Sequence, residues 1–306
     1  MVWKLPSLQS DRQRPQVPEG VRVYAVGDIH GRADLLAPVL LQIEIDIALH
    51  PVRRPLVVFL GDYIDRGPDS KEVLDLLIAA GHAAETVFLK GNHETFLLDF
   101  LKDPTLLERW RQFGGLETLV SYGLQPPIHP SLDDRIALAR TLAGALPPSH
   151  RRFLEDLKTT FVCGDFLFVH AGLRPLVPIE QQAEEDLLWI RDDFLHWDKA
   201  FDKVVVHGHT PVLEPDIRFN RINIDTGAFA TGRLSCLTIE AAEIGVLADA
   251  RHWLGALPDI AAAPGEPLQD PQTIAAIHAR RLKENPRLYD ANTLARLDPR
   301  QCPAPS

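Results

Sequence analysis

The sequence has little of what holds extracellular proteins or thiolate zinc sites together. Three cysteines occur in 306 residues, namely Cys163, Cys236 and Cys302, and no two of them form a Cys-x-x-Cys pair. An odd and sparse set of cysteines excludes a disulfide framework and a zinc ribbon. We therefore predict a reducing, cytoplasmic location for this chain.

Long apolar runs and an excess of positive charge are also missing. No apolar stretch approaches the roughly 20 residues of a membrane-spanning helix, and the polar, proline-rich start lacks a signal-peptide core. The formal net charge is −10, whereas nucleic-acid-binding proteins usually present a basic face. We expect no nucleic-acid partner and no membrane partner, and the oligomeric state stays open. Any phosphate site must create its positive field locally, with metals and arginines.

What is present indicates an α/β protein. Apolar residues make up 45% of the chain, which is enough for a sizeable core. Hydrophobic patterning predicts strands at Val21–Val26, Leu56–Leu60 and Thr86–Leu89. Helical spacing predicts helices at Ala33–Leu49 and Ser70–Ala80, and we take the first residue of the second helix as its N-cap. Strands that alternate with helices predict a sheet with crossover connections.

The second half of the chain predicts another sheet. Residues 95–157 carry a helical pattern broken by glycine and proline pairs, so we expect a helical insertion over one edge of the site. Strand patterns then return and predict a second, more antiparallel sheet, which completes a four-layer α/β/β/α sandwich of two mixed sheets. We assign residues 1–20 to an N-terminal extension, 21–256 to the domain and 257–306 to a Pro/Ala-rich linker and tail. The later strands are predicted at Thr160–Cys163, Phe166–His170, Val204–His207, Ile222–Ile224 and Leu234–Ile239.

Polar side chains follow five of the predicted strands at the point where each strand ends. Open α/β sheets bind ligands beyond the carboxyl ends of their strands, so these side chains are expected to meet. Asp28 and His30 share the first loop, whose glycines permit a tight turn. Asp62 directly follows a buried strand, where a carboxylate is costly unless a cation or donors meet it. The remaining members are Asn92, His93, His170 and His209.

Each of these signals has a structural alternative when it is taken alone. Asp28 can be a capping residue beside a surface histidine, and Asp65 with Arg66 can be a structural ion pair. Asn92 can cap the next helix, and a single histidine at a strand end is more often a satisfied core residue. Two histidine segments combined with three acidic or amide loops favour a metal site over all of these alternatives.

In this order, the five segments resemble the signature blocks of the phosphoprotein phosphatase family within the calcineurin-like metallophosphoesterases. The resemblance runs from about Val21 to Glu240. The stretch Ile224-Asp225-Thr226-Gly227-Ala228 is similar to the bacterial and phage serine/threonine phosphatase branch. The segment from Trp110 to Tyr122 also resembles bacterial protein-phosphatase-like chains. The fold implied is the metallophosphoesterase-type sandwich.

The resemblance implies two divalent metal ions. Oxygen and imidazole ligands suit Mn²⁺, Fe or Zn²⁺ more than a soft metal, and the family makes Mn²⁺ the first choice. His207 corresponds to a position that is not a ligand. The implied ligands are Asp28 and His30 for the first ion, Asp62 as the bridge, and Asn92, His170 and His209 for the second ion.

The implied activity is hydrolysis of phosphomonoesters, phosphoserine or phosphothreonine in proteins or a small phosphoester, by in-line attack of a metal-bridging hydroxide. His93 would donate a proton to the leaving group while Asp65 orients its ring. Arg66 and Arg191 would bind the phosphoryl oxygens. Arg191 lies in a charged stretch and can equally be a surface residue.

Two other functions stay open. A symmetrical dinucleoside tetraphosphate hydrolase shares nearly all the blocks, but it tends to lack the acid at the position of Asp65 and to carry Asp in place of Glu94. Both differences favour the phosphatase. An inactive scaffold that binds a partner is the remote alternative, since no ligand and no acid is lost in this chain.

Overall fold

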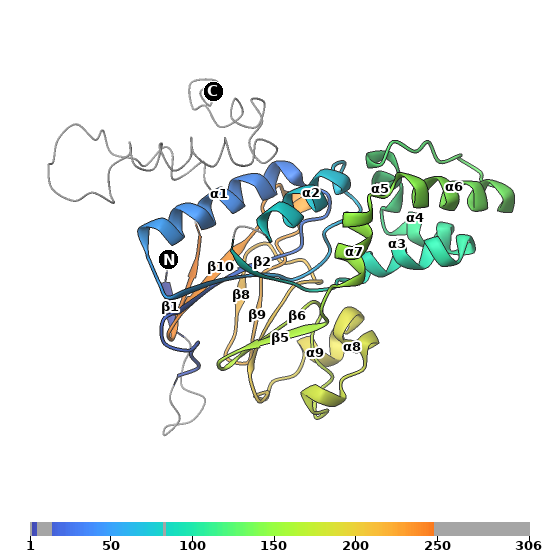
Figure 1. The fold of residues 1–306 in the computed structure, drawn as a ribbon. Helices are drawn as coiled ribbons and strands as arrows, with labels where there is room; N and C mark the ends of the chain where they lie inside the picture. Colours follow the sequence, from blue (N-terminus) through green and yellow to red (C-terminus); the bar gives the residue numbers. More distant parts are fainter. Residues whose placement is uncertain (1, 5–13, 82–83, 248–306) are drawn as a thin grey trace, which may run out of the picture.

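Two mixed β-sheets form the centre of the molecule, as the ribbon of this computed structural model shows (Figure 1). The structure describes residues 2–4, 14–81 and 84–247. In order across the first sheet, the six strands are β1 (Val2–Lys4), β11 (Glu243–Val246), β10 (Cys236–Glu240), β2 (Val21–Val26), β3 (Arg54–Phe59) and β4 (Glu85–Phe88). Across the second sheet, the five strands are β5 (Thr160–Cys163), β6 (Phe166–Val169), β7 (Val204–His207), β9 (Arg221–Asn223) and β8 (Asp216–Ile217).

Each sheet has a parallel part that sets the direction of the site loops. In the first sheet β2 pairs parallel with β3 and β3 with β4, whereas β10 pairs antiparallel with β2. In the second sheet β7 pairs parallel with both β6 and β9, and β5 and β8 are antiparallel edges. The carboxyl ends of the parallel strands therefore leave each sheet at one edge, where ligands collect in such folds.

Three apolar clusters stack the layers. Alternation along β2 places Tyr24 under the helices α1 (Ala33–Leu49) and α2 (Ser70–Ala80), and Val23 against the second sheet. Side chains of β6 and β7 complete that inner cluster. On the far face of the second sheet, Leu167 packs in a cluster with residues of the short helices α8 (Glu184–Trp189) and α9 (Asp192–Leu195). The predicted four-layer α/β/β/α sandwich is confirmed.

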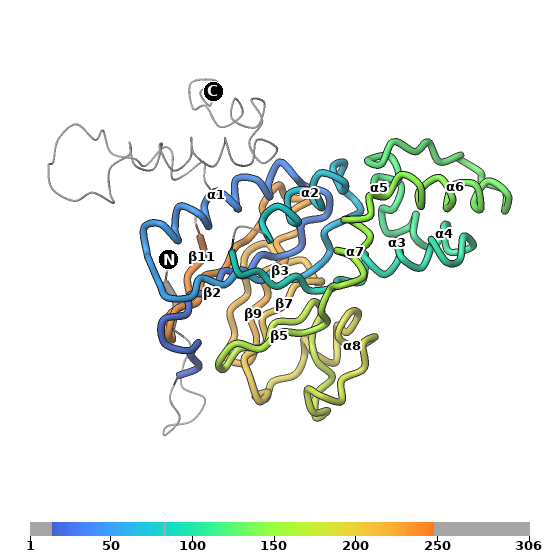
Figure 2. Tube along the Cα trace, viewed as in Figure 1, coloured from blue at the N-terminus to red at the C-terminus, as the bar shows by residue number. Residues whose placement is uncertain are grey.

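The helices between β4 and β5 form a lobe at one side of the sandwich, called the helical lobe below (Figure 1). Figure 2 follows the chain out from β4 into this lobe and back through α7 to β5. The lobe begins at Asn92, so two candidate site residues lie in its first turn. Its helices are α3 (Asn92–Lys102), η1 (Pro104–Leu106), α4 (Leu107–Gln112), α5 (Gly115–Ser121), α6 (Leu132–Ala145) and α7 (Pro148–Glu155). The other short helices are η2 (Ile179–Gln181) and α10 (Ala228–Thr231).

Some expectations about elements are wrong. The strand predicted at Leu234–Ile239 returns to the first sheet as β10, because its apolar side chains complete the faces of β2. Residues 2–4, assigned to an extension, pair with β11. Ser70 does not cap α2: the N-cap is Asp69 without a side-chain cap bond, and Ser70 Oγ accepts from the backbone N–H of Asp65 at 3.1 Å.

The tail at 257–306 lies outside the described residues. Among the residues that the structure does describe, no helix combines the length and apolarity needed to cross a bilayer. Cys163 and Cys236 are both free and buried.

Candidate metal centre and active site

The candidate residues lie on loops held in uncommon backbone conformations. His30, Asp62 and His209 have φ values of 48°, 53° and 65°, a left-handed region that non-glycine residues rarely adopt. The neighbouring loops also approach one another closely. A Cβ on Gly91 would collide with Asp62 Oδ1, so only glycine lets the third loop reach the second. Strained residues of this kind cluster at functional sites.

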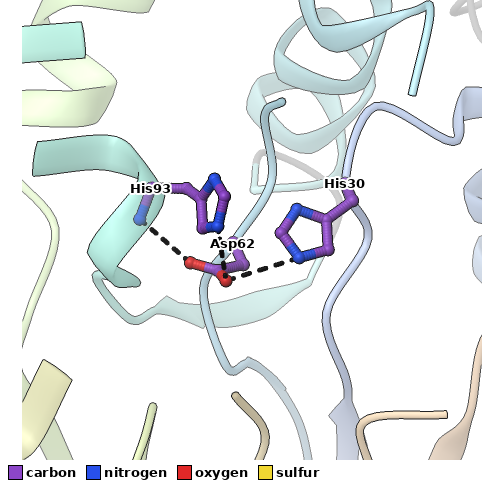
Figure 3. Close-up of side chains that lie close together, drawn as sticks. All are labelled: His30, Asp62 and His93. Atoms are coloured by element: carbon purple, nitrogen blue, oxygen red, sulfur yellow. Dashed lines mark hydrogen bonds and ion pairs between the residues drawn. The ribbon is translucent and has the colours of Figure 1, made fainter. Parts of the chain in front are cut away.

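Asp62 stands at the centre of the site. Its Oδ2 lies 3.4 Å from His30 Nε2 and 3.8 Å from His93 Nε2, and Figure 3 shows both rings approaching this one oxygen. Its Oδ1 lies 3.4 Å from His170 Nε2. The two oxygens of one buried carboxylate therefore face different histidines, as a ligand that bridges two ions requires.

Backbone carbonyls fix which histidine nitrogen faces Asp62. His30 Nδ1 donates to the carbonyl of Ile64 at 3.0 Å, and His170 Nδ1 donates to the carbonyl of Leu60 at 2.9 Å. These bonds leave the Nε2 lone pair of each ring directed at the centre. A carbonyl acceptor on the second nitrogen is the usual support for a metal-ligating histidine.

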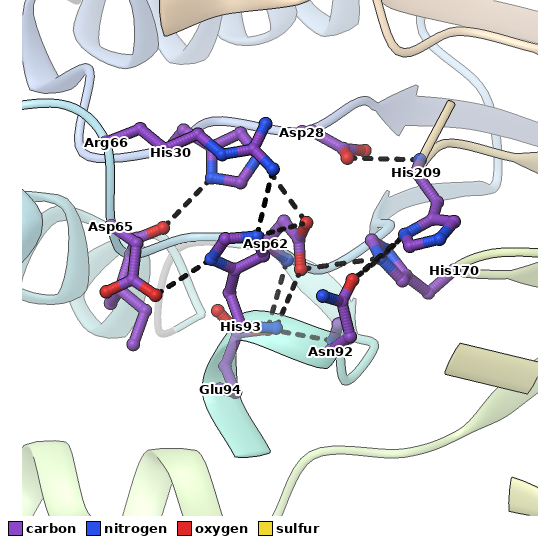
Figure 4. A network of polar contacts seen from close by, with 12 residues as sticks. Asp28, His30, Asp62, Asp65, Arg66, Asn92, His93, Glu94, His170 and His209 are labelled. Carbon is purple, nitrogen blue, oxygen red and sulfur yellow. Dashed lines mark hydrogen bonds and ion pairs between the residues drawn. The ribbon is translucent and has the colours of Figure 1, made fainter. Parts of the chain in front are cut away.

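Asn92, His170 and His209 converge on the other side of Asp62 (Figure 4). Asn92 Oδ1 lies 2.9 Å from both His170 Nε2 and His209 Nδ1, and these two nitrogens are 3.2 Å apart. The backbone N–H of His209 donates to Asp28 Oδ2 at 3.1 Å. The N-cap of α3 is Gly91, so Asn92 does not cap this helix. The amide oxygen of Asn92 instead faces the two imidazoles.

Burial sets the protonation of the histidines. It lowers the pKa of His30, His170 and His209 despite the attraction of the Asp62 carboxylate, which favours the neutral ring, the form that binds metals. Burial alone would raise the pKa of Asp62, but the surrounding histidines, His170 first, hold it below its usual range.

The net pKa shift is upward for two further buried carboxyl groups, and burial is its largest cause. Burial raises the pKa of Asp28 well above the usual range, reinforced by repulsion from Asp225 and Asp62. It also raises the pKa of Asp225 to about 6. Crowded buried carboxylates of this kind are costly unless a cation neutralises them.

The described residues fit a pair of divalent metal ions. Two groups of side chains have ligand atoms within 4.8 Å of one another, and Asp62 belongs to both: His30, Asp62 and His93, and Asp62, His170 and His209. Asp28 Oδ1 is buried and has no hydrogen-bond partner among the described residues, so its lone pairs are available to a cation. Oxygen and imidazole donors are those that Mn²⁺, Fe and Zn²⁺ accept.

His93 is held differently from the other histidines. Its Nδ1 donates to Asp65 Oδ2 at 2.8 Å, and the guanidinium of Arg66 donates to its Nε2 at 3.2 Å. Burial alone would lower the pKa of His93, but the carboxylates of Asp62 and Asp65 raise it above the usual value. A histidine oriented by a carboxylate and biased toward protonation is suited to give up a proton.

Arg191 is held less firmly than the other predicted site residues. It is exposed, and its side chain makes no hydrogen bond or ion pair with another residue in the described ranges. Its charge nevertheless contributes to the lowered pKa values of His170 and His209. The structure therefore leaves its phosphate-binding role a prediction.

Two contributors to the site were missed as functional residues. Glu94 accepts the backbone N–H groups of Gly91, Asp62 and Tyr63 at 2.8, 3.0 and 2.8 Å, so it holds the second and third loops together. Phe229 lies beside His30 with ring centroids 5.5 Å apart, and the guanidinium of Arg66 lies 4.7 Å above its ring. The sequence signal for Glu94 was its place in the Asn-His-Glu segment, whereas Phe229 carried none.

Comparison with known proteins defines the class to which this fold and site belong. Residues 21–231 match the family described as calcineurin-like phosphoesterase, so the chain belongs to that family. The predicted family is confirmed at this level.

Two similar proteins are named as dinucleoside tetraphosphatases. A bis(5'-nucleosyl)-tetraphosphatase PrpE [asymmetrical] of Anoxybacillus flavithermus is 31% identical over 233 residues, covering 69% of this chain and 88% of the relative. A relative of the same name from Oceanobacillus iheyensis is 28% identical, covering 70% and 87%. A crystal structure provisionally described as a diadenosine tetraphosphatase matches with a TM-score of 0.50 at 23% identity, covering 74% and 92%, and it supports the fold alone.

Proposed function

We propose that this protein is a metal-dependent phosphohydrolase that cleaves dinucleoside tetraphosphates. The observation that carries hydrolysis is the convergence of His30, His93 and His170 on the single buried carboxylate of Asp62. The curated relatives support the nucleotide substrate over the phosphoprotein that the sequence favoured. Their names also favour an asymmetrical cut, whereas the alternative considered from the sequence was the symmetrical one.

The proposed ligands divide between two ions. When bound, two divalent ions acidify a water molecule and stabilise negative charge on the phosphoryl oxygens. Asp62 would contact both ions, and the identity of the metals, with Mn²⁺ first, stays a prediction. The remaining ligands would be Asp28 and His30 for one ion, and Asn92, His170 and His209 for the other.

The residues beside the ligands would handle substrate and proton. Arg66 would bind the phosphoryl oxygens, and its guanidinium lies 3.2 Å from His93 Nε2, so a phosphoryl group bound there would lie next to that nitrogen. His93 Nε2 accepts from Arg66 in the structure. Once Arg66 binds a phosphoryl group instead, that nitrogen would be free to carry a proton, which His93 would give to the departing oxygen. Asp65 keeps the ring in place through its bond to Nδ1 at 2.8 Å.

Phosphomonoester hydrolysis is the second candidate, and the pair Asp65–His93 favours it. A serine or threonine alkoxide is strongly basic and leaves only when it is protonated, whereas a nucleotide phosphate is a weak base and departs more easily. A carefully oriented acid is therefore of most use on a monoester. In this second candidate function, the substrate that binds at the same site is a phosphorylated protein or a small phosphoester.

A product analysis separates these functions. The purified full chain, loaded with Mn²⁺, is given diadenosine tetraphosphate, a phosphoserine peptide and p-nitrophenyl phosphate, and the nucleotides are separated by chromatography. We expect ATP and AMP, with a kcat/KM for the dinucleotide above that for the peptide. Two molecules of ADP would indicate the symmetrical cut, and faster release of phosphate from the peptide would overturn the proposal. Metal binding without any turnover would indicate an inactive scaffold.

A further inference from the structure

The carboxylate of Asp65 is enclosed by donors, only one of which is the acid. Asp65 is fully buried. Besides His93 Nδ1, it accepts from Trp110 Nε1 at 3.1 and 2.9 Å, and from Thr118 Oγ1 at 2.6 Å. The Thr118 hydroxyl also accepts from the backbone N–H of Asp65 at 2.9 Å. Each oxygen of the carboxylate is therefore fixed by more than one bond.

The two extra donors belong to the helical lobe and not to the sheets. Trp110 lies on α4 and Thr118 on α5, and both side chains are fully buried. Asp65 itself has a left-handed backbone with φ 71°, which non-glycine residues hold only where their surroundings impose it. Two lobe helices thus reach back to the loop after β3 and hold one residue in a fixed, uncommon geometry.

A pair of glycines allows this approach. A Cβ on Gly115 would lie 2.5 Å from the Trp110 ring, and one on Gly114 would lie 2.7 Å from the backbone nitrogen of Arg66. The carbonyl of Gly114 accepts the N–H of Arg66 at 3.0 Å. The Gly114-Gly115 pair therefore brings the lobe into contact with both members of the Asp65-Arg66 segment.

We propose that Trp110 and Thr118 are positioning residues for the proton donor. They hold Asp65 so that its second oxygen meets His93 Nδ1, which in turn leaves His93 Nε2 directed at the leaving group. The helical lobe is then part of the catalytic machinery. This inference rests on the proposed function, because it requires His93 to be the acid.

A leaving-group series measures the proton donation itself. The substrates are aryl phosphates from 2,4-dinitrophenyl phosphate, whose weakly basic phenolate leaves without a proton, to phenyl phosphate, whose phenolate needs one. Thr118→Val replaces the hydroxyl with a methyl group of similar size, and Trp110→Phe removes the indole N–H together with one ring of the indole. Tyr122→Phe is the matched control, since it deletes another buried lobe bond, to His150 Nδ1 at 2.7 Å, and does not contact Asp65. His93→Asn is the reference for complete loss of the acid.

We expect Thr118→Val and Trp110→Phe to lower kcat on phenyl phosphate about tenfold or more, and on 2,4-dinitrophenyl phosphate less than about threefold, with little change in KM. Thr118→Ser keeps the hydroxyl and should therefore keep the wild-type rate. Tyr122→Phe should leave the ratio of the two rates unchanged. Equal losses on both substrates, or no loss, in a folded Thr118→Val protein with full metal content would overturn the inference.

The reference variant distinguishes two kinds of failure. If His93→Asn shows the steep dependence on the leaving group and Thr118→Val does not, the inference alone fails. If His93→Asn shows no such dependence, or the wild-type protein turns over neither aryl phosphates nor dinucleotide, the proposed function fails and takes the inference with it. A further readout needs no turnover: the downfield proton resonance of His93 Nδ1–H in the zinc-loaded protein should shift in Thr118→Val and stay in place in Tyr122→Phe.

Discussion

At the scale of the residue, the role of His93 can be tested most directly. This side chain lies within 4.8 Å of the ligand atoms of His30 and Asp62, which would suit a metal ligand. Its Nδ1 is nevertheless bonded to Asp65 and its Nε2 to the guanidinium of Arg66. A nitrogen that faces an arginine is poorly placed to bind a cation, because the two positive charges repel each other.

We therefore predict that His93→Asn lowers kcat by about two orders of magnitude or more, while the protein keeps two metals. The asparagine fills a similar space but holds no proton to donate. Turnover and metal content, the latter by elemental analysis, should be measured on the same sample. Loss of one metal equivalent in this variant would make His93 a ligand and would contradict its role as the acid.

Asp28 gives a prediction about pH. Burial and the charge of Asp225 raise its pKa, so the metal-free carboxyl keeps a proton at a higher pH than an ordinary aspartate. A metal must displace that proton, and apparent affinity should therefore rise with pH. Asp225→Asn removes the neighbouring charge, lowers the pKa of Asp28 and should reduce the number of protons released when the metal binds.

Calorimetry in two buffers of different ionisation enthalpy counts those protons. The surface variant Asp216→Asn, whose carboxylate pairs with Arg218 at 2.8 Å, serves as the control and should behave like the wild-type protein. Equal proton release from the wild-type protein and Asp225→Asn would show that Asp28 is already ionised before the metal arrives.

At the scale of the element, helices and strands were predicted well where hydrophobic periodicity was strong. The predicted ranges Val21–Val26, Ala33–Leu49 and Val204–His207 coincide with β2, α1 and β7, because each is a continuous pattern of apolar residues, which in β2 and β7 is buried on both faces. The strands β1, β8 and β11 were missed. They are short segments of two to four residues at or next to a sheet edge, and pairing with a neighbour defines them more than their own sequence does.

Gly115, the first residue of α5, yields a prediction about stability. A methyl group at Gly115 would meet the buried Trp110 ring at 2.5 Å, so Gly115→Ala should destabilise the protein by about 1–3 kcal/mol. A methyl group at Gly144 in α6 would have no described atom within 4 Å, so Gly144→Ala should stabilise it by about 0.5–1 kcal/mol. Urea unfolding followed by tryptophan fluorescence measures both, and equal effects would contradict the tight packing at Gly115.

At the scale of the whole molecule, the site joins both sheets and the helical lobe. Asp62 follows β3 in the first sheet, His170 follows β6 in the second, and Asn92 opens the lobe. A cation that binds all three would therefore connect three parts of the structure. It would also neutralise carboxylates that burial otherwise leaves crowded.

Metal removal should consequently weaken the whole fold and not only the activity. A chelator should lower Tm by about 5 °C or more, since a ligand bound far above its Kd contributes a few kcal/mol to stability. Differential scanning calorimetry with and without chelator tests this, and metal added back should restore both Tm and turnover. The variant Asp62→Asn lacks the bridging charge and should respond much less. A Tm that is insensitive to the chelator in the wild-type protein would argue against a metal centre.

The sequence by itself determined which groups are available and roughly where they lie. Polar residues directly after buried strands must leave the sheet at its carboxyl edge, and this local rule was enough to select Asp28, Asp62 and His170. Only the tertiary structure decided which atoms meet. Asp62 reaches two histidines with separate oxygens, and Trp110 reaches Asp65 across 45 residues of chain, because contacts of that kind depend on how layers and lobe pack and have no periodic trace in the chain.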